Sequence, residues 1–387
     1  MKKILCLSFW TPPVVRPQSI LIGKMIPEWL KQGLEPVIVS YQESGQWNID
    51  VPIHQIPQMK KGRLSRIPFI RKTRQKRYYR KIVNICKNII NEHKIDLVFS
   101  FAKPMESNTI GALLKQECGV KFVSHFSDPW YDNPYSSEKN DAVLTEESFI
   151  MEQSDKVIFT NSVQQDLMLK KYLNKHYENK SHIIPHCFDS SAYPQLKNNN
   201  DKFTISYIGA FYQERNPQIL FEALSEVLTS DKDKNTVQLE LVGAANDYAG
   251  YSNEQISEMV QSYGLSSCVN IIPAVPYEES LKYIKDSDCL VAIDANFKDS
   301  PFLPSKLADY AGSGNFILSI SPTASPTEEF VRNLGCQSFN YQQKGELVEF
   351  LQKAIIDGQM PELDANKTIR YSAKSTTQEL INIFQNT

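Results

Sequence analysis

The segment DSPFLPSKLADYAGSGNFILS, residues 299–319, combines residue types that could bind an anion and a sugar. Pro304 is typical of a helix start, so Ser305 and Lys306 fall in the first helical turn. Free backbone N–H groups, a hydroxyl and an ammonium at a helix N-terminus form an anion site. Asp309 follows one turn later, where its carboxylate can accept hydrogen bonds from sugar hydroxyls. The pattern therefore indicates a site for a sugar that carries a diphosphate.

A second candidate phosphate contact follows the apolar run at 203–208. Gly209 lets the backbone approach a phosphate closely, and Arg215 could form paired hydrogen bonds with its oxygens. A plain turn with a solvated arginine would explain the same two residues. Because residues 299–319 offer a second anion-binding element, we favour a shared diphosphate site. The dinucleotide fingerprint GxGxxG is absent from the chain, which argues against an NAD-binding enzyme.

Two polar groups in the first half of the chain could act on an acceptor. His125 and Asp128 follow a short apolar run, and either side chain could orient an acceptor hydroxyl or stabilise charge on a transferring group. Alternatively, His125 ends a strand and Asp128 begins a turn. Arg16 lies in a proline-rich loop after the first apolar run and could bind an acceptor phosphate. An ordinary turn stiffened by proline is the alternative for that loop.

The sequence predicts no metal site and no cofactor apart from a sugar-nucleotide substrate. Asp286–Ser287–Asp288 matches the DxD pattern of some metal-dependent transferases, but it stands between a helix and a strand, where Asp commonly ends a helix. The seven cysteines form no CxxC pair. An odd and scattered set of cysteines is typical of reduced thiols in a cytosolic protein.

The stretch 51–91 contains no Asp or Glu and is rich in Lys and Arg, among them Arg71, Lys72, Arg74 and Arg77. Aromatic and aliphatic residues interleave with these cations. Such a segment suits an anionic membrane surface, where each basic residue contributes about 1 kcal/mol. A solvated helix face and a nucleic-acid patch are the alternatives. No nucleic-acid-binding motif accompanies it, so we expect no nucleic-acid partner.

Short apolar runs alternate with amphipathic segments along the chain, which predicts parallel sheets covered by helices. The expected strands are 4–9, 36–40, 97–100, 122–125 and 157–160, then 203–208, 237–242, 269–272, 289–293 and 316–320. The expected helices of the first half lie near 20–33, 74–92, 106–118, 142–154 and 163–173. In the second half, Gly312 and Gly314 are expected to end the helix that follows Pro304.

A chain of 387 residues suggests two domains. We predict an α/β protein with one domain at 1–185, a linker at 186–202, a second domain at 203–365, and a helix at 366–387 that packs back on the first domain. Ligands of such sheets bind beyond the carboxyl ends of the strands, so the cleft between the domains is the expected site. No apolar segment reaches the roughly 20 residues of a membrane-spanning helix. We expect a cytoplasmic protein that could attach to the inner face of the membrane.

Three motifs resemble the retaining glycosyltransferases of the GT-B fold, family 4. They are Tyr207–Gly209 with Arg215–Pro217, the block Pro304–Tyr310, and His125–Trp130. The last is similar to a D-F-R-D-P-W form found in bacterial surface-polysaccharide members of that family. The resemblance covers both halves of the chain and implies two doubly wound Rossmann-like domains that face a cleft.

The resemblance implies roles for single residues. Arg215, Ser305 and Lys306 fall where the family binds the donor diphosphate. Asp309 matches the second acid of the family's E-x7-E motif, which binds the ribose. Val275 would lie in the loop that holds the base.

The chain departs from the family at Pro301, which stands where the first acid of E-x7-E is expected. The donor sugar would then need another carboxylate, and Asp299 and Asp294 are the nearest candidates.

The resemblance implies a retaining glycosyltransferase that moves a sugar from a nucleotide-diphosphate sugar to a saccharide acceptor. The bacterial members suggest a lipid-linked acceptor in surface-polysaccharide synthesis, such as capsule or O-antigen. A nucleotide-sugar 2-epimerase is a second possibility. A degenerate GT-B subunit that binds a membrane partner is a third, because Pro301 replaces an acid.

Overall fold

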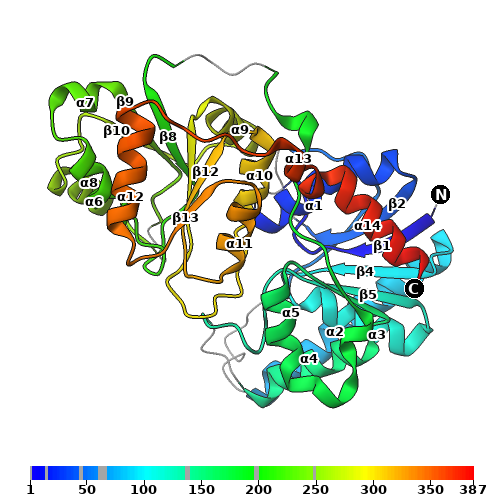
Figure 1. The fold of residues 1–387 in the computed structure, drawn as a ribbon. Helices are drawn as coiled ribbons and strands as arrows, with labels where there is room; N and C mark the ends of the chain where they lie inside the picture. Colours follow the sequence, from blue (N-terminus) through cyan, green and yellow to red (C-terminus); the bar gives the residue numbers. More distant parts are fainter. Residues whose placement is uncertain are drawn as a thin grey trace. The chain divides into compact units, whose positions relative to one another are not determined.

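The computed structural model describes two compact units, each built on a parallel sheet (Figure 1). One unit comprises Met1–His186 with Ala373–Thr387, and the other comprises Cys187–Ser372. The described residues are 2–13, 16–42, 47–59, 68–135, 140–195, 200–246 and 250–387. No helix among them is long and apolar enough to cross a membrane.

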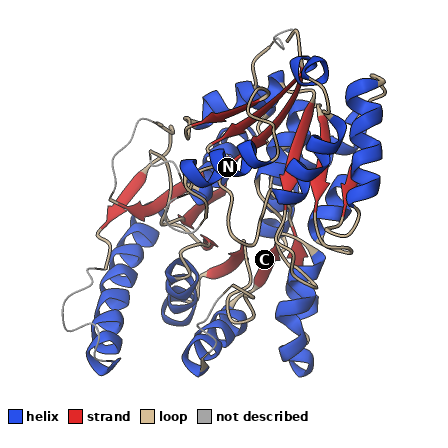
Figure 2. Ribbon diagram, turned by 90° about the vertical axis from the view of Figure 1, so that its left-hand side faces the viewer, coloured by secondary structure: helices blue, strands red, loops and turns tan. Residues whose placement is uncertain are grey.

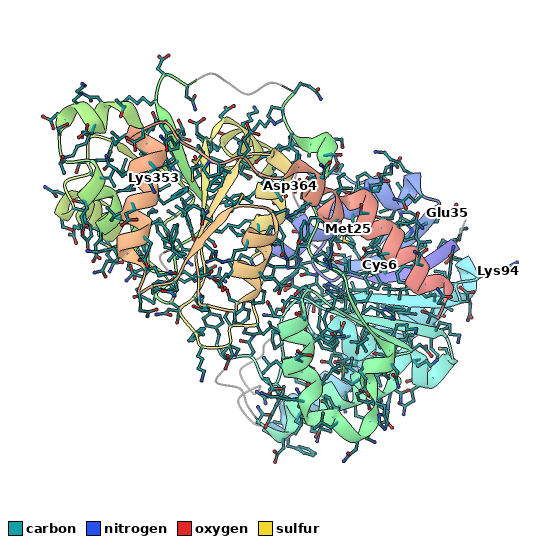
Figure 3. All side chains as sticks on the ribbon, viewed as in Figure 1. Cys6, Met25, Glu35, Lys94, Lys353 and Asp364 are labelled. Atoms are coloured by element: carbon teal, nitrogen blue, oxygen red, sulfur yellow. The ribbon has the colours of Figure 1, made fainter. Side chains whose placement is uncertain are left out.

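The sheet of the first unit has the strand order β3-β2-β1-β4-β5-β6-β7, and its strand pairs are parallel. Helices cover it, so the inner strands are nearly continuous apolar runs (Figure 2). Cys6 on β1 and Met25 on α1 are both buried in this core (Figure 3). The strands are β1 Lys2–Leu7, β2 Leu34–Tyr41, β3 Ile53–Ile56, β4 Leu97–Phe101, β5 Lys121–Phe126, β6 Lys156–Phe159 and β7 Ser181–Ile183. The helices are α1 Pro17–Lys31, α2 Pro68–His93, α3 Glu106–Cys118, α4 Asp141–Gln153, α5 Ser162–Leu169 and α14 Ala373–Gln385.

The sheet of the second unit has the strand order β10-β9-β8-β11-β12-β13. The order reverses between β8 and β11, which pair through Ile205 and Cys289, and ligands of such sheets bind beyond the carboxyl ends of the strands at this reversal. The strands are β8 Phe203–Ile208, β9 Val237–Val242, β10 Val269–Ile272, β11 Cys289–Ile293, β12 Phe316–Ile320 and β13 Gln337–Phe339. The helices are α6 Gln218–Val227, α7 Asp231–Thr236, α8 Asn253–Ser262, α9 Tyr277–Asp286, α10 Lys306–Ser313, α11 Pro326–Asn333, α12 Lys344–Leu351 and α13 Ala365–Thr368.

The two glycines of the 299–319 block have different roles. Gly314 ends α10 in the left-handed conformation, with φ of 79°, as the sequence predicts. Gly312, however, lies inside the helix and does not end it. A Cβ at Gly312 would stand 2.4 Å from the Tyr193 hydroxyl and 2.5 Å from Phe188. Gly312 is therefore needed for close packing inside the second unit.

The unit boundaries differ in detail from the predicted domains. Residues 187–195 and 200–202, expected in a linker, group with the second unit, as do 366–372. Helix α14 groups with the first unit and contacts α1, where Gln32 Nε2 donates a hydrogen bond to the Lys374 carbonyl at 2.9 Å.

Candidate active site

Two cations and a carboxylate from separate segments of the second unit lie close together. Arg215 follows β8, Asp294 follows β11, and Lys306 opens α10. An Arg215 guanidinium nitrogen is 3.9 Å from Asp294 Oδ1. Lys306 Nζ donates a hydrogen bond to the Ile208 carbonyl at the end of β8, at 3.1 Å. The three charged groups thus gather at the carboxyl ends of the two strands where the strand order reverses.

The Lys306 ammonium is held against an aromatic ring and away from bulk water. It lies 3.5 Å from the centre of the Tyr207 ring, which is fully buried. Burial lowers the pKa of Lys306 well below its usual value, Arg215 lowers it further, and Asp294 opposes the shift. A desolvated cation in such a place interacts strongly with an incoming anion, because the local dielectric constant is low.

Asp294 anchors this cluster rather than facing solvent. Its side chain is fully buried, and it accepts hydrogen bonds from the Ala295 N–H at 2.8 Å and the Thr327 hydroxyl at 2.9 Å. Burial raises the pKa of Asp294, while Arg215 and these hydrogen bonds lower it. Thr327, which lies 33 residues further along the chain, was missed by sequence reasoning because no local pattern links it to Asp294.

The other predicted phosphate-binding residues lie on the adjoining segments. Gly209 directly follows β8 with φ of 105°, a conformation that favours glycine, and its N–H donates to the Val242 carbonyl at 2.8 Å. Ser305 precedes α10 and is half-buried, and its hydroxyl makes no hydrogen bond with any described residue. The Gly209 N–H is thus used within the sheet, whereas the Ser305 hydroxyl is not, and a phosphate contact by either residue stays a prediction.

Asp309 is more enclosed than the sequence suggests. It is buried, and its Oδ1 accepts a hydrogen bond from the Tyr277 hydroxyl at 3.0 Å. Tyr277 begins α9, two residues after Val275, so the loop after β10 meets α10 at this contact. A base contact by Val275 and a ribose contact by Asp309 stay predictions.

The two candidate acids for the donor sugar occupy different environments. Asp299 is exposed and has a positive φ of 58°. Pro301, at the position of the missing acid, is buried between Ser300 and Phe302, which are also buried. Asp294 is enclosed, as described above. A donor-sugar contact by Asp299 or Asp294 stays a prediction.

The first unit contains a buried histidine at the end of β5. His125 is 5% exposed, and its ring stacks on Phe101 with centroids 4.3 Å apart. Its Nδ1 is buried with no hydrogen-bond partner among the described residues. Burial lowers the pKa of His125 to about 3, and nearby His186 lowers it too. The imidazole is therefore neutral near pH 7, and its Nδ1 is available for a hydrogen bond.

His186 is a neighbour that sequence reasoning missed, because it lies 61 residues from His125 in what reads as a linker. Burial lowers the pKa of His186 to about 4, Lys24 lowers it further, and Asp128 opposes the shift. Asp128 forms an ion pair with Lys103 at 2.9 Å, and both side chains are partly exposed. His125, His186 and Asp128 are thus grouped within the first unit.

Acidification is expected to destabilise the first unit through these histidines. In the unfolded chain a histidine has a pKa of about 6.5, so below that pH the unfolded state binds more protons. Each histidine then removes about 1.4 kcal/mol of stability per pH unit until the pH nears its folded pKa. Urea titrations followed by tryptophan fluorescence between pH 7 and 5 measure this slope, since all four tryptophans (Trp10, Trp29, Trp47 and Trp130) belong to this unit.

The variant His125→Asn should flatten this pH dependence, whereas His176→Asn should not, because His176 is exposed. Equal slopes for the wild type and His125→Asn would contradict the assignment.

Arg16 immediately precedes α1 and is exposed. Its guanidinium carbon lies 4.9 Å from the centre of the Trp10 ring. An acceptor contact by Arg16 stays a prediction. Among the described residues, no three His, Cys, Asp or Glu side chains are grouped so that they could hold a metal ion. In the DxD segment, Asp288 Oδ2 instead accepts a hydrogen bond from the Thr204 N–H at 2.9 Å.

Comparisons with known proteins agree with this geometry. Residues 191–294 match the family model for glycosyl transferases group 1. No curated protein matches the chain in sequence. Sucrose-phosphate synthase from Thermosynechococcus elongatus has a similar structure, with 17% identity and a TM-score of 0.73 over 100% of this chain and 99% of that chain.

Two further solved structures share the fold along the whole chain. Alr3699/HepE from Anabaena, solved in complex with UDP, is 14% identical, with a TM-score of 0.69 and coverage of 100% of both chains. The lipopolysaccharide outer core galactosyltransferase WaaB is 14% identical, with a TM-score of 0.66 over 100% of this chain and 99% of that chain. The chain thus has the fold of the GT-B glycosyltransferases, and within it residues 191–294 are similar to the glycosyl transferases group 1 family.

Proposed function

We propose that this protein transfers a sugar from a nucleotide-diphosphate sugar to a saccharide acceptor, without a metal ion and with retention of anomeric configuration. The observation that carries the proposal is the convergence of Arg215 and Lys306 at the carboxyl ends of β8 and β11. Two cations at this position suit a diphosphate, and Arg215 lies within the matched family domain. Retention is taken from the family resemblance.

In this reaction the main role of the protein is to stabilise the negative charge that develops on the departing nucleoside diphosphate. The bond between the sugar's anomeric carbon and the diphosphate oxygen breaks, and the nucleoside diphosphate leaves with the electron pair. Arg215, Lys306 and the N-terminus of α10 would stabilise this leaving group. The acceptor hydroxyl attacks the same face of the sugar, and its proton passes to an oxygen of the departing phosphate. In the first unit, His125 or Asp128 would orient the acceptor.

A lipid-linked acceptor in bacterial surface-polysaccharide synthesis is the context we favour. WaaB, which shares the fold, is a lipopolysaccharide outer core galactosyltransferase. The second support is α2, whose outer face is strongly basic. Phe69 is 80% exposed, and Lys72, Lys76 and Arg80 follow at spacings of three and four residues, so the four form one strip of the helix.

Further along α2, Tyr79, Ile82 and Cys86 are buried and fix the helix in the core. Of the other cations predicted to meet a membrane, Arg71 and Arg77 are exposed and Arg74 is half-buried. Lys60, Lys61, Arg63 and Arg66 lie outside the described residues. An exposed aromatic ring next to several cations suits the headgroup region of an anionic bilayer.

The double variant Lys72→Glu/Lys76→Glu is expected to weaken binding to anionic vesicles by at least about tenfold, since each basic residue contributes about 1 kcal/mol. Sedimentation with phosphatidylserine-containing and pure phosphatidylcholine vesicles measures the effect. Lys232→Glu/Lys282→Glu is the matched control, because both lysines are exposed on the second unit. Equal vesicle binding by the two double variants would refute a membrane role for α2.

Incubation with a panel of nucleotide sugars, with and without a lipid-linked saccharide, tests the proposed reaction. Slow release of nucleoside diphosphate that accelerates with acceptor supports transfer. Structures of the 2-epimerase class, such as the putative UDP-N-acetylglucosamine 2-epimerase from Listeria monocytogenes, also have this fold, so conversion of the donor sugar without an acceptor is scored separately. If the protein binds none of the nucleotide sugars, the transferase proposal is overturned. The remaining alternative is then a degenerate GT-B subunit.

A further inference from the structure

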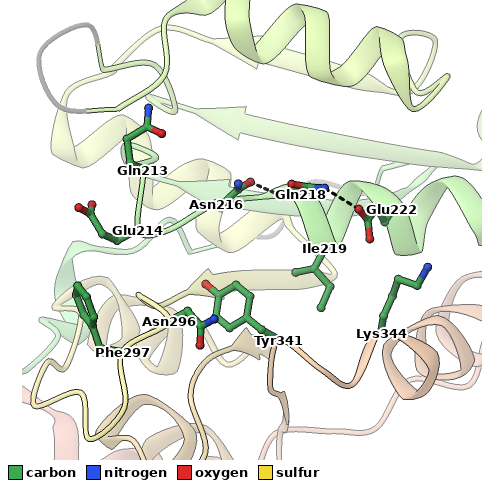
Figure 4. A pocket seen from close by; sticks show the side chains of 10 residues that line it. All are labelled: Gln213, Glu214, Asn216, Gln218, Ile219, Glu222, Asn296, Phe297, Tyr341 and Lys344. Carbon is green, nitrogen blue, oxygen red and sulfur yellow. Dashed lines mark hydrogen bonds between the residues drawn. The ribbon is translucent and has the colours of Figure 1, made fainter.

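We propose that a pocket beside α6 and α12 of the second unit binds a neutral saccharide, separately from the diphosphate-binding residues. The pocket has a volume of about 450 Å3. Small-ligand pockets range from roughly 300 to 1,000 Å3, so this one suits one or two sugar rings. Its lining includes Gln213, Asn216, Glu222, Asn296, Phe297 and Tyr341 (Figure 4).

Amide side chains supply hydrogen-bonding groups that the fold does not use. The Asn296 side chain makes no hydrogen bond with any described residue. Asn216 Oδ1 accepts from the Gln218 N–H at 2.8 Å, which leaves its NH2 group as a donor. Gln213 donates to the Gly250 carbonyl at 3.2 Å, which leaves its side-chain oxygen as an acceptor. Mixed donors and acceptors match sugar hydroxyls, which both donate and accept.

Apolar surfaces complete the lining. Phe297 lies toward one end of the pocket, next to Glu214, and Ile219 lies nearer the other end (Figure 4). The Tyr341 ring is fixed because its hydroxyl donates a hydrogen bond to the Asp294 carbonyl at 2.5 Å. A sugar ring has an apolar face of C–H groups, and rigid aromatic rings are suitable surfaces for it. Aromatic rings together with amides therefore favour a saccharide over a purely apolar ligand.

The charges of the lining disfavour an anionic ligand. Glu214 and Glu222 line the pocket, and the lining cation Lys344 is paired with Glu226 at 2.6 Å. A phosphate or carboxylate would meet these two acids without an unpaired cation in the lining to balance them. The ligand class is therefore a neutral mono- or disaccharide.

The β8–α6 loop separates this pocket from the diphosphate-binding residues. Arg215 reaches Asp294, whereas its neighbours Glu214 and Asn216 line the pocket. Gly209, Ser305 and Lys306 do not line it. The saccharide site does not depend on the transfer reaction, so it can be tested without a donor and its outcome does not decide the proposed function.

Saturation-transfer NMR with the full chain and maltose, cellobiose or lactose tests the proposal. We expect saturable binding of at least one disaccharide, weakened roughly three- to tenfold by Phe297→Ala or Asn296→Ala. Phe69→Ala and Asn270→Ala are matched controls, because both residues are exposed elsewhere and their loss should change nothing. Excess UDP should not displace the sugar, and glucose 6-phosphate should bind more weakly than glucose.

Four results would overturn the proposal: no saturable binding of any of the three disaccharides, unchanged binding in both pocket variants, displacement of the sugar by UDP, or tighter binding of glucose 6-phosphate than of glucose. Circular dichroism of each variant shows whether a loss of binding reflects a loss of fold. If Phe297→Ala misfolds, the test depends on Asn296→Ala alone. A folded Asn296→Ala protein that binds as the wild type does then contradicts the site.

Discussion

Replacing Lys306 by alanine is expected to lower kcat/KM for release of the nucleoside diphosphate by about 10²–10³-fold, the usual effect of removing one preorganised charge-stabilising group. The ammonium is fixed by the Ile208 carbonyl and the Tyr207 ring, so no rearrangement is needed when charge develops on the diphosphate. Water around an exposed lysine would weaken the same interaction. Steady-state kinetics with the best donor of the panel measures the effect.

The same lysine gives donor binding a pH dependence of definite sign. Burial holds the pKa of Lys306 well below its usual value in the free protein. A bound diphosphate favours the charged form and raises that pKa, so binding takes up a proton when the free lysine is neutral. Affinity for UDP should therefore fall as the pH rises through the pKa of the free lysine, and calorimetry in two buffers of different ionisation enthalpy measures the proton uptake.

Lys353→Ala is the control for this prediction, because Lys353 is an exposed lysine of the same unit (Figure 3). It should retain wild-type kinetics. Arg215→Ala should also lose turnover, but it removes the countercharge of buried Asp294 and so destabilises the fold as well. Lys306→Ala is the cleaner test, and a folded Lys306→Ala enzyme with near wild-type kcat/KM would remove the main support for the proposed reaction.

The sequence predicts the sheets well because buried parallel strands are continuous apolar runs. β8 to β12 are found at the predicted residues, and GT-B architecture follows from that alternation and the motifs. β3, β7 and β13 were not predicted, since each has only three or four residues and the first two are largely half-buried at the sheet edges. Short edge strands carry little hydrophobic signal of their own.

Single-residue environments were harder to predict, because they depend on contacts between distant segments. The block at 299–319 shows a lysine and an acid one turn apart. It does not show that the Tyr277 hydroxyl donates a hydrogen bond to Asp309, or that the Tyr207 ring lies next to the Lys306 ammonium. In the same way, nothing near His125 in the sequence indicates His186. Residue type and spacing predict which groups could act, whereas burial and pKa come from tertiary packing.

A buried ion network in the first unit predicts the largest loss of stability. Glu147 on α4 is completely buried, and it accepts hydrogen bonds from Lys171 at 2.9 Å, the Tyr172 hydroxyl at 3.0 Å and the Tyr131 N–H at 2.9 Å. Lys171 also pairs with Asp132. The network thus connects α4 and the segment after α5 to the loop that follows Asp128.

Glu147→Ala is expected to lower the free energy of unfolding of the first unit by about 3–5 kcal/mol, because removing one member of a buried ion pair leaves its partners without compensation. Urea denaturation followed by tryptophan fluorescence measures it, since the four tryptophans all lie in this unit. Glu147→Gln should lower the free energy of unfolding less, because its amide oxygen can still accept a hydrogen bond from the Tyr172 hydroxyl or the Tyr131 N–H.

The matched control is Glu178→Ala, which breaks the exposed pair of Glu178 with His176. Exposed pairs contribute about 0–1 kcal/mol, so this variant should unfold almost as the wild type does. If Glu147→Ala and Glu178→Ala lower the free energy of unfolding equally, the network does not hold the loop after Asp128. If Glu147→Ala is strongly destabilised as expected, the network that holds the loop after Asp128 contributes most of this stability.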